Sequence, residues 1–292
     1  WPLTILTVSF TSPTLISMTI TQHARALLSA GCVFVAAGHA HAGAWTQAQG
    51  DLLAISNQVY FTSDAFWDLD GDKQSQSRFN KYEINPYLEY GLRDDITLGA
   101  NLFLQYVRQD INGQSEDNIG LADTELFLRK RLYKDDNWVI SLQPLLKLPS
   151  QFSDDDALPR GGSSPWDAEL SLMAGYSFKA LARYHFVDSR IAYRKRANSL
   201  RDQVKLEAKL GWQLYDGFYV IPAAYATLST DLPDNATFQQ SGELDYDLYK
   251  LELTGLYKLD DSRFVQAGGF AHVDGRNTGK GYGFMLSIGQ TF

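Results

Sequence analysis

The stretch GYGFMLSIGQTF, residues 281–292, shows a regular alternation of side-chain types. Tyr282, Phe284, Leu286, Ile288 and Phe292 are apolar and share one parity, whereas the residues between them are mostly small or polar. Successive side chains of a β-strand point to opposite faces, so this period of two predicts a strand with one apolar face.

The same alternation recurs along the chain from residue 50 onward, for example in ITLGANLFLQYV (residues 96–107) and VKLEAKLGWQL (residues 204–214). It is typical of strands that are buried on one face only. Twelve segments of this kind cover residues 50–61, 80–92, 95–108, 120–133, 137–149, 166–178, 184–196, 203–215, 218–230, 245–258, 263–273 and 280–292. Each is long enough for a tilted strand that crosses a membrane.

The connections between these segments alternate in length. Those after the even-numbered segments are brief, as in LRDD, KDDN, YDG and LDDSR. Those after the odd-numbered segments are mostly longer and polar, and four are predicted as loops: residues 62–78, 108–120, 149–165 and 229–243. An even number of strands with short turns at one end and long loops at the other is the layout of bacterial outer-membrane barrels.

The predicted fold class is therefore all-β, a closed antiparallel up-and-down transmembrane β-barrel of about 12 strands. A soluble sandwich or jelly roll would also alternate, but its turns need not sort by length. The sequence places Pro222 at a bulge or a weak pairing, because proline cannot donate to a strand ladder. A change of parity near Leu248 predicts a second irregularity.

The first 42 residues differ in composition from the rest, since Arg25 is their sole charged residue. Residues 18–42 are predicted to be a signal peptide, with an apolar stretch from Ala26 to Ala37 and an A-x-A cleavage site at Ala40–Ala42. Residues 1–17 precede its Met18 and are predicted to be a non-native or mis-started segment, and residues 43–292 are predicted to form the barrel.

Removal of this leader would leave 25 basic and 34 acidic residues, so the net charge would change from −8 to −9. An acidic chain of this kind is not expected to bind nucleic acid. The single cysteine, Cys32, would leave with the leader, which excludes disulfide and thiol chemistry in the mature protein.

GYGFMLSIGQTF also resembles the carboxy-terminal recognition strand of Gram-negative outer-membrane proteins. The resemblance implies that Phe284, Leu286, Ile288 and Phe292 form an assembly signal. It also implies that the assembly machinery, outer-membrane lipid and lipopolysaccharide are partners. With GLADTELFLRKRL, PLLKLPS and HVDGRNTGKG, the chain further resembles a family of outer-membrane barrels grouped with transporters of aromatic degradation, such as the phenol meta-pathway. That second resemblance carries no functional residues over to this chain.

If the apolar faces meet lipid, many charged side chains point into the barrel. The predicted lumen-lining residues are Glu83, Asp123, Glu125, Arg129, Arg131, Lys147, Asp167, Glu169, Arg190, Arg194, Arg196, Lys205, Glu207 and Lys209. Five of the six acidic members lie on the second to sixth segments, and several basic ones lie on the seventh and eighth, which suggests a pore with acidic and basic walls and a transverse field. The alternative is that these side chains pair and fill the lumen, because twelve strands lie between packed and open barrels.

Two weaker candidates for chemistry remain. Asp68, Asp70 and Asp72 could gather oxygen ligands for Ca²⁺, but Gly71 stands at the fourth position of the run and no Glu stands at the twelfth. A solvated acidic loop is the simpler interpretation. The mature chain has two histidines, and His272 with Asp274, Asp68 and Asp70 could form a hydrolase site at the barrel mouth, whereas His185 is expected in the lumen or a turn.

The sequence thus predicts a passive channel or transporter for small solutes in the outer membrane, without a cofactor and without enzymatic activity. Two alternatives are an outer-membrane hydrolase of the phospholipase or omptin type and a structural or adhesive barrel. The glycines of the final segment, Gly281, Gly283 and Gly289, are expected to leave open space on the lumen side, which would favour a channel.

Overall fold

The computed structural model describes residues 43–111, 114–149, 151–152, 166–197, 200–231 and 245–292. All of them belong to one compact unit. The predicted leader, with its segments 1–17 and 18–42, lies outside the described residues, and so does nearly all of the predicted loop 149–165. The regular elements are strands: β1 (Leu52–Trp67), β2 (Lys73–Arg93), β3 (Ile96–Asn101), β4 (Leu104–Ile111), β5 (Gln114–Leu121), β6 (Thr124–Lys134), β7 (Trp138–Leu148), β8 (Gln151–Phe152), β9 (Asp167–Ala180), β10 (Arg183–Arg196), β11 (Gln203–Tyr215), β12 (Phe218–Ser229), β13 (Asp247–Lys258), β14 (Arg263–Arg276) and β15 (Thr278–Thr291).

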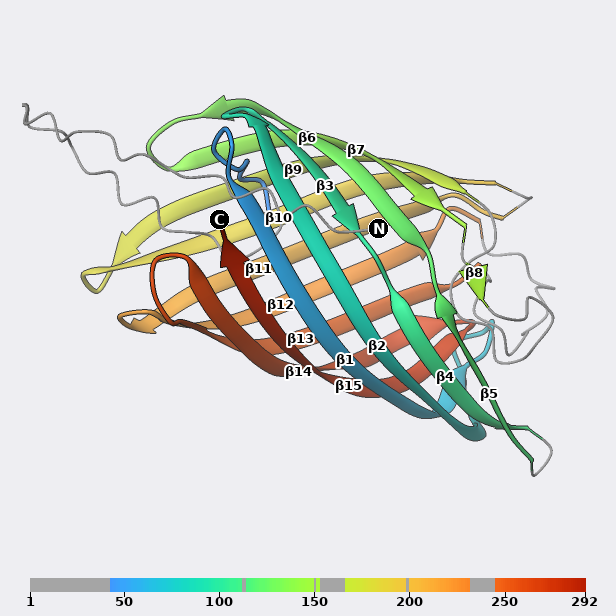
Figure 1. Ribbon diagram of the computed structural model, residues 1–292. Helices are drawn as coiled ribbons and strands as arrows, with labels where there is room; N and C mark the ends of the chain where they lie inside the picture. The colour runs from blue at the N-terminus through green and yellow to red at the C-terminus, as the bar shows by residue number, and fades with distance from the viewer. Residues whose placement is uncertain (1–42, 112–113, 150, 153–165, 198–199, 232–244) are drawn as a thin grey trace, which may run out of the picture. The chain divides into compact units, whose positions relative to one another are not determined.

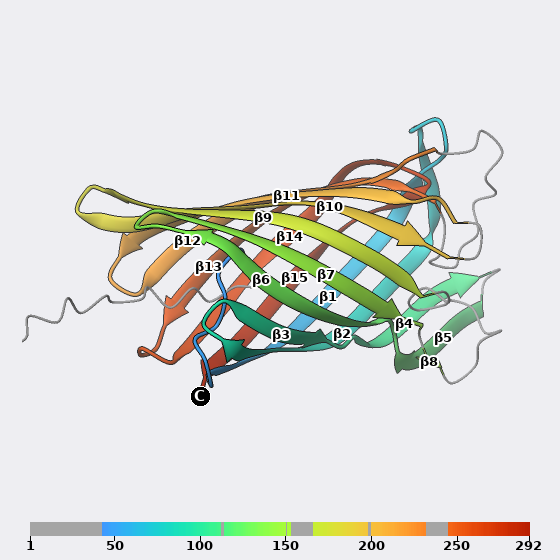
Figure 2. The same ribbon diagram turned by 90° about the horizontal axis from the view of Figure 1, so that it is seen from above.

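These strands form one antiparallel sheet that closes on itself, because β1 pairs with both β2 and β15. β3 and β4 together form one interrupted barrel strand, and β5 and β6 together form the next. β8 is a two-residue strand that pairs with β5. The barrel therefore has twelve barrel strands when these interrupted strands are counted once, which confirms the predicted fold class. Figures 1 and 2 show the strands running obliquely around the barrel axis.

Brief turns gather at the end of the barrel where β1 begins and β15 ends, and in outer-membrane barrels this is the periplasmic end. The turn between β9 and β10 consists of Leu181 and Ala182, which both have positive φ, as in the two-residue turns that match strand twist.

At the opposite, extracellular end, two of the predicted loops are wrong. Residues 62–78 are mainly the ends of β1 and β2, and residues 108–120 are mainly the hairpin of β4 and β5. These strand ends extend past the apolar belt. Most of their residues are polar, as in residues 73–78 of β2, so they lack the apolar alternation that marks a membrane strand.

The outer surface of the barrel is apolar around its waist. On β15, the last strand, Phe284, Leu286 and Ile288 are 57%, 47% and 53% exposed. Exposed leucines and isoleucines continue this belt over the other strands of the barrel. No helix among the described residues is long and apolar enough to cross a membrane. The last strand closes the barrel against the first, because Leu53, Ile55 and Val59 lie opposite Thr291, Gly289 and Met285.

The interior glycines do not leave open space, so that expectation was wrong. A Cβ added at Gly289 would lie 2.1 Å from the Phe264 ring, and one at Gly283 would lie 2.3 Å from the Phe270 ring. At Gly281 an added Cβ would lie 2.6 Å from the Phe61 ring. Aromatic side chains of the inner face therefore cover the glycines of neighbouring strands, a pairing that sets strand curvature and register.

Both predicted irregularities are present. Between β11 and β12 the paired register is interrupted from Leu210 to Gly211, opposite Pro222. Between β13 and β14 the register shifts after Tyr249, and Val273 is the extra residue.

Candidate functional site: the charged lumen

The predicted lumen-lining charges lie on the inner face of the barrel, most of them in ion pairs. The residues in question are Glu83, Asp123, Glu125, Arg129, Arg131, Lys147, Asp167, Glu169, Arg190, Arg194, Arg196, Lys205, Glu207 and Lys209. They do not form two opposed walls, which corrects the expected transverse field. β7, β9, β10 and β11 are consecutive neighbours in the sheet, so acidic and basic side chains meet across adjacent strands.

Glu169 is the centre of the largest ion-pair network. Its carboxylate lies 2.7 Å from Arg194 Nε, 3.1 Å from Arg190 Nη1 and 3.6 Å from Lys205 Nζ, and its side chain is fully buried. Arg194 also reaches Glu125 at 2.7 Å, which links β10 to β6 across the interior. A buried carboxylate with three cations around it is held in one position. These side chains therefore occupy this side of the lumen as a rigid group.

The ion pairs on this wall continue toward the extracellular end, because Arg194 Nη1 also lies 3.8 Å from Asp167. The ammonium group of Lys147 lies 3.2 Å from Asp123 and 3.0 Å from Asp167. Arg196 pairs with Asp245 at 3.3 Å. In these ion pairs, each charged side chain that the sequence predicted for this region is neutralised by a neighbouring side chain of opposite charge.

A separate ion pair lies near the periplasmic end. Arg129 Nη2 lies 2.8 Å from Glu89, and the two side chains are 1% and 0% exposed. Arg129 also donates to Gln143 Oε1 at 3.0 Å, and the Tyr87 hydroxyl donates to Glu89. Sequence reasoning had selected Arg129 but missed Glu89, although it shares the parity of Glu83 on the same strand.

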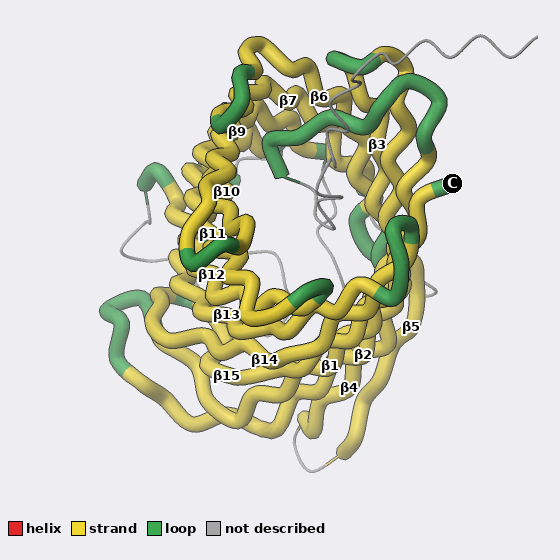
Figure 3. Tube along the Cα trace, turned by 90° about the vertical axis from the view of Figure 1, so that its left-hand side faces the viewer, coloured by secondary structure: helices red, strands yellow, loops and turns green. Residues whose placement is uncertain are grey.

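The residues before β1 enter the barrel, which the sequence did not predict. We call residues 43–50 the lumenal segment; Figure 3 shows this loop reaching into the ring of strands from the periplasmic end. Arg129 Nη1 donates to the Trp45 carbonyl at 2.8 Å, and Arg131 Nη1 donates to Thr46 Oγ1 at 3.0 Å. Gln47 donates through its side chain to Glu89 at 2.6 Å. The Glu89–Arg129 pair is thus also the anchor of the lumenal segment.

Apolar contacts hold the same segment. Ala44 is fully buried with Val139 and Met173. The Trp45 ring lies over Gly175, where an added Cβ would come within 2.5 Å of it, and it meets Phe186 edge-on with centroids 6.0 Å apart. Gly175 therefore makes room for the indole.

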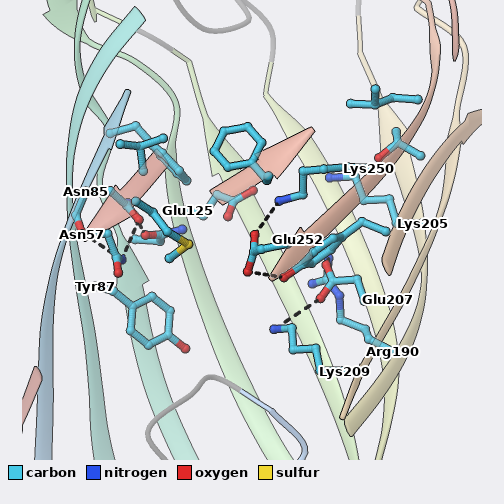
Figure 4. Close-up of a pocket in the computed structure, with 18 of the residues that line it drawn as sticks. Asn57, Asn85, Tyr87, Glu125, Arg190, Lys205, Glu207, Lys209, Lys250 and Glu252 are labelled. Carbon is cyan, nitrogen blue, oxygen red and sulfur yellow. Dashed lines mark hydrogen bonds and ion pairs between the residues drawn. The ribbon is translucent and has the colours of Figure 1, made fainter. Parts of the chain in front are cut away.

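Above the lumenal segment, toward the extracellular end, lies a cavity of about 670 Å³. Its charged lining comprises six cations, Lys81, Arg129, Arg190, Lys205, Lys209 and Lys250, and four carboxylates, Glu83, Glu125, Glu207 and Glu252. Asn57, Asn85 and Tyr87 lie on one wall and Glu207, Glu252 and Lys250 on the facing wall (Figure 4). The cavity is therefore polar along its sides, and its lining holds more cations than carboxylates. Glu89 and Glu169 pair with Arg129, Arg190 and Lys205 from outside this lining.

Tyr225 is the centre of the cationic wall. Lys250 Nζ lies 3.9 Å and Lys209 Nζ 5.7 Å from the centroid of its ring, within the range of cation–π attraction. The Tyr225 hydroxyl donates to Glu252 at 3.3 Å, and Lys250 donates to the same carboxylate at 3.2 Å. Sequence reasoning missed Lys250 and Glu252 because the parity changes near Leu248; their alternation with Leu251 and Leu253 was the available signal.

The floor of the cavity is apolar. A cluster of buried side chains lies inside the periplasmic half: Leu53, Ile55, Tyr87, Phe127, Leu145, Tyr219, Ile221, Leu256 and Phe264, with Phe186 packed against them. The interior of the barrel is therefore charged in its middle and apolar in its periplasmic half.

The predicted Ca²⁺ ligands take another role. Asp68 Oδ1 accepts hydrogen bonds from the backbone N–H groups of Asp70 and Asp72 at 3.1 and 2.9 Å, and Oδ2 accepts from Gln74. These bonds lower the pKa of Asp68 and tie its carboxylate to the turn between β1 and β2. No group of three possible metal ligands occurs in the part of the chain that is described.

The predicted hydrolase group is not assembled. His272 lines the cavity and its Nδ1 lies 2.8 Å from the Gly279 carbonyl, whereas Asp274 is exposed and accepts from the N–H of Gly275. The extra residue Val273 turns the two side chains apart. His185 is also not in the lumen: it shares the outward parity of Val187 and stacks on Trp212, with centroids 4.0 Å apart.

Comparisons with known proteins bear on the fold. No family model matches the sequence, and no curated protein is significantly similar to it. An outer membrane channel from Pseudomonas putida F1 superposes with a TM-score of 0.62 at 16% identity, over 85% of this chain and 97% of that one. The chain folds as an outer-membrane β-barrel. Its apolar belt accordingly lies in the lipid of the bacterial outer membrane, and the resemblance to such barrels that the sequence indicated is confirmed for the fold.

Two further solved structures are similar at lower scores. The translocator domain of the autotransporter NalP from Neisseria meningitidis has a TM-score of 0.48 at 12% identity, over 84% of this chain and 90% of that one. A mutant of the TodX monoaromatic hydrocarbon channel has a TM-score of 0.47 at 9% identity, over 84% and 91%.

Proposed function

We propose that the protein is a narrow passive channel that admits small organic solutes and favours anions over cations. The observation that carries this proposal is the lumenal cavity of about 670 Å³ with six cations and four carboxylates in its lining. In a low-dielectric wall, an excess of one charge raises the local concentration of solutes of the opposite charge. The apolar floor adds a preference for solutes that also have an apolar part.

The proposal is a channel and not an enzyme. His272 and Asp274 point apart, so the barrel mouth lacks the hydrogen-bonded pair that hydrolysis would need among the described residues. Phe284, Leu286, Ile288 and Phe292 remain the proposed signal for the assembly machinery. Phe292 also helps to close the barrel, because its N–H donates to the Leu52 carbonyl at 2.9 Å.

Charge selectivity is tested with a matched pair of solutes. Proteoliposomes should take up succinate faster than 1,4-diaminobutane, which has the same chain length and the opposite charge. The double variant Lys209→Glu/Lys250→Glu should lower the ratio of the two uptake rates by about tenfold or more, because it reverses the charge beside Tyr225.

Lys73→Glu is the matched control, since Lys73 is exposed at the start of β2 and outside the cavity. It makes the same kind of charge change and should leave the ratio unaltered. Equal uptake of the two solutes by the unmodified protein would contradict the proposed preference, and no uptake of either would contradict the channel.

A further inference from the structure

Asp188 lies inside the barrel beside the start of the lumenal segment. It is 6% exposed on β10, and its Oδ2 accepts a hydrogen bond from the Ala44 N–H at 2.9 Å. Gly43 lies against the same carboxylate, because a Cβ added there would come within 1.9 Å of this oxygen. The Gly43 backbone therefore touches the Asp188 carboxylate, and no other residue type fits at position 43 without moving it.

No side-chain cation of the described residues lies within ion-pair distance of the Asp188 carboxylate. Lys209 lies directly opposite it in the register of β10 and β11, but the Lys209 ammonium group is turned toward Glu207 at 4.0 Å and the Tyr225 ring. Within the described part of the chain, Asp188 forms no ion pair with a side chain. A buried carboxylate is costly unless a cation or several hydrogen-bond donors compensate it.

The predicted signal-peptide cleavage would supply that cation. Hydrolysis of the peptide bond between Ala42 and Gly43 adds one water, leaving a carboxylate on Ala42 and an amino group on Gly43 that is protonated at neutral pH. The nitrogen that gains this charge is the Gly43 backbone nitrogen, one covalent bond, about 1.5 Å, from the Gly43 Cα that lies against Asp188.

We propose that processing after Ala42 creates an α-ammonium group on Gly43 that pairs with Asp188, and that this ion pair fastens the lumenal segment inside the barrel. The precursor holds an uncharged amide at this position, so the segment would be locked only after cleavage. This proposal rests on the predicted leader and on the geometry of Asp188, and it holds whether or not the barrel conducts solutes.

The first test is the identity of the mature amino terminus. The full chain is exported in a Gram-negative host, purified from the outer membrane and measured by intact mass. The expected first residue is Gly43. A mature chain that begins at any other residue would overturn the proposal, because the charge would then lie away from Asp188.

The second test is the reactivity of the Gly43 amine toward an amine-acylating reagent near neutral pH, followed by peptide mass spectrometry. In the folded protein the paired amine should react about tenfold more slowly than in Asp188→Asn, since hydrogen bonds to charged groups are the strong ones. Asparagine keeps an acceptor for the Ala44 N–H and removes the charge. Equal rates in the two proteins would refute the ion pair.

Asp94→Asn is the control, because Asp94 Oδ1 accepts from the Gln49 N–H at 3.0 Å at the other end of the lumenal segment. It should leave the slow rate unchanged. Should Asp188→Asn not fold, as judged by heat-modifiable mobility, the pH profile of the unmodified protein decides. An apparent pKa of the Gly43 amine above about 8 supports the pair, and a value of about 8 or below refutes it.

Discussion

Replacing Arg129 with methionine is expected to lower the free energy of unfolding by about 3–5 kcal/mol, the range for removing one partner of a buried ion pair. Arg129 is 1% exposed, and its loss leaves the fully buried Glu89 carboxylate without its cation. The substitution also removes the donors to Gln143 and to the Trp45 carbonyl. The protein should therefore both unfold earlier and release its lumenal segment.

Urea unfolding of the detergent-folded protein, followed by tryptophan fluorescence, measures this effect. Lys130→Met is the matched control, because Lys130 is the next residue, is 39% exposed and pairs with Asp95 outside the lumen. It should cost about 1 kcal/mol or less. The double variant Glu89→Gln/Arg129→Met should recover part of the loss, since it leaves no unpaired charge. A loss for Arg129→Met no larger than the control would show that the pair is not structurally important.

Deleting residues 44–49 is expected to raise the single-channel conductance by about twofold or more, because conductance follows the open area at the narrowest part of a pore. The lumenal segment lies across the periplasmic half of the barrel, where Trp45 packs between Gly175 and Phe186. Planar bilayer recordings of the variant beside the unmodified protein make the comparison, with heat-modifiable mobility as proof of folding.

Ala48→Ser is the control for the deletion, since Ala48 is exposed and its side chain does not fill the lumen. It should leave the conductance unaltered. An unchanged conductance in the folded deletion variant would show that the lumenal segment does not limit permeation.

The alternation of side chains was sufficient to predict a closed barrel of twelve strands. Alternate residues of each strand face lipid and lumen, so every second side chain is apolar. It failed at the extracellular end, where β1 reaches Trp67 and β2 begins at Lys73. The first residues of β2, 73–78, are polar and mostly exposed, whereas Ala65 and Trp67 of β1 are buried, so no regular apolar period marks both strands of this hairpin. The sequence cannot distinguish such a hairpin from a loop.

The alternation along each strand predicts which charged side chains point into the barrel. It does not predict which of them form ion pairs with one another. Which carboxylate meets Arg194 depends on the register of β9 with β10, which the sequence pattern leaves open. Likewise, the interior glycines suggested empty space because the aromatic rings that cover them, such as Phe264 over Gly289, belong to other strands.

Apart from Trp45, nothing in the sequence of the lumenal segment indicated that it enters the barrel. Its residues, GAWTQAQG, show no alternation and carry no charge, so they resemble a linker. What places them inside the barrel is a set of hydrogen bonds to backbone atoms, such as Ser141 Oγ to the Ala44 carbonyl at 2.5 Å. Backbone atoms are present in every sequence, and contacts to them cannot be inferred from side-chain patterns.

The central claim is that the lumen is an open path for small solutes and not a packed core. Single-channel recording of the folded, unmodified protein in planar bilayers tests it most directly. We predict discrete conductance steps, with a zero-current potential in a salt gradient that shows preference for the anion. Folded protein that inserts into the bilayer and produces no steps would contradict the account and would show that the ion pairs, the apolar cluster and the lumenal segment close the barrel.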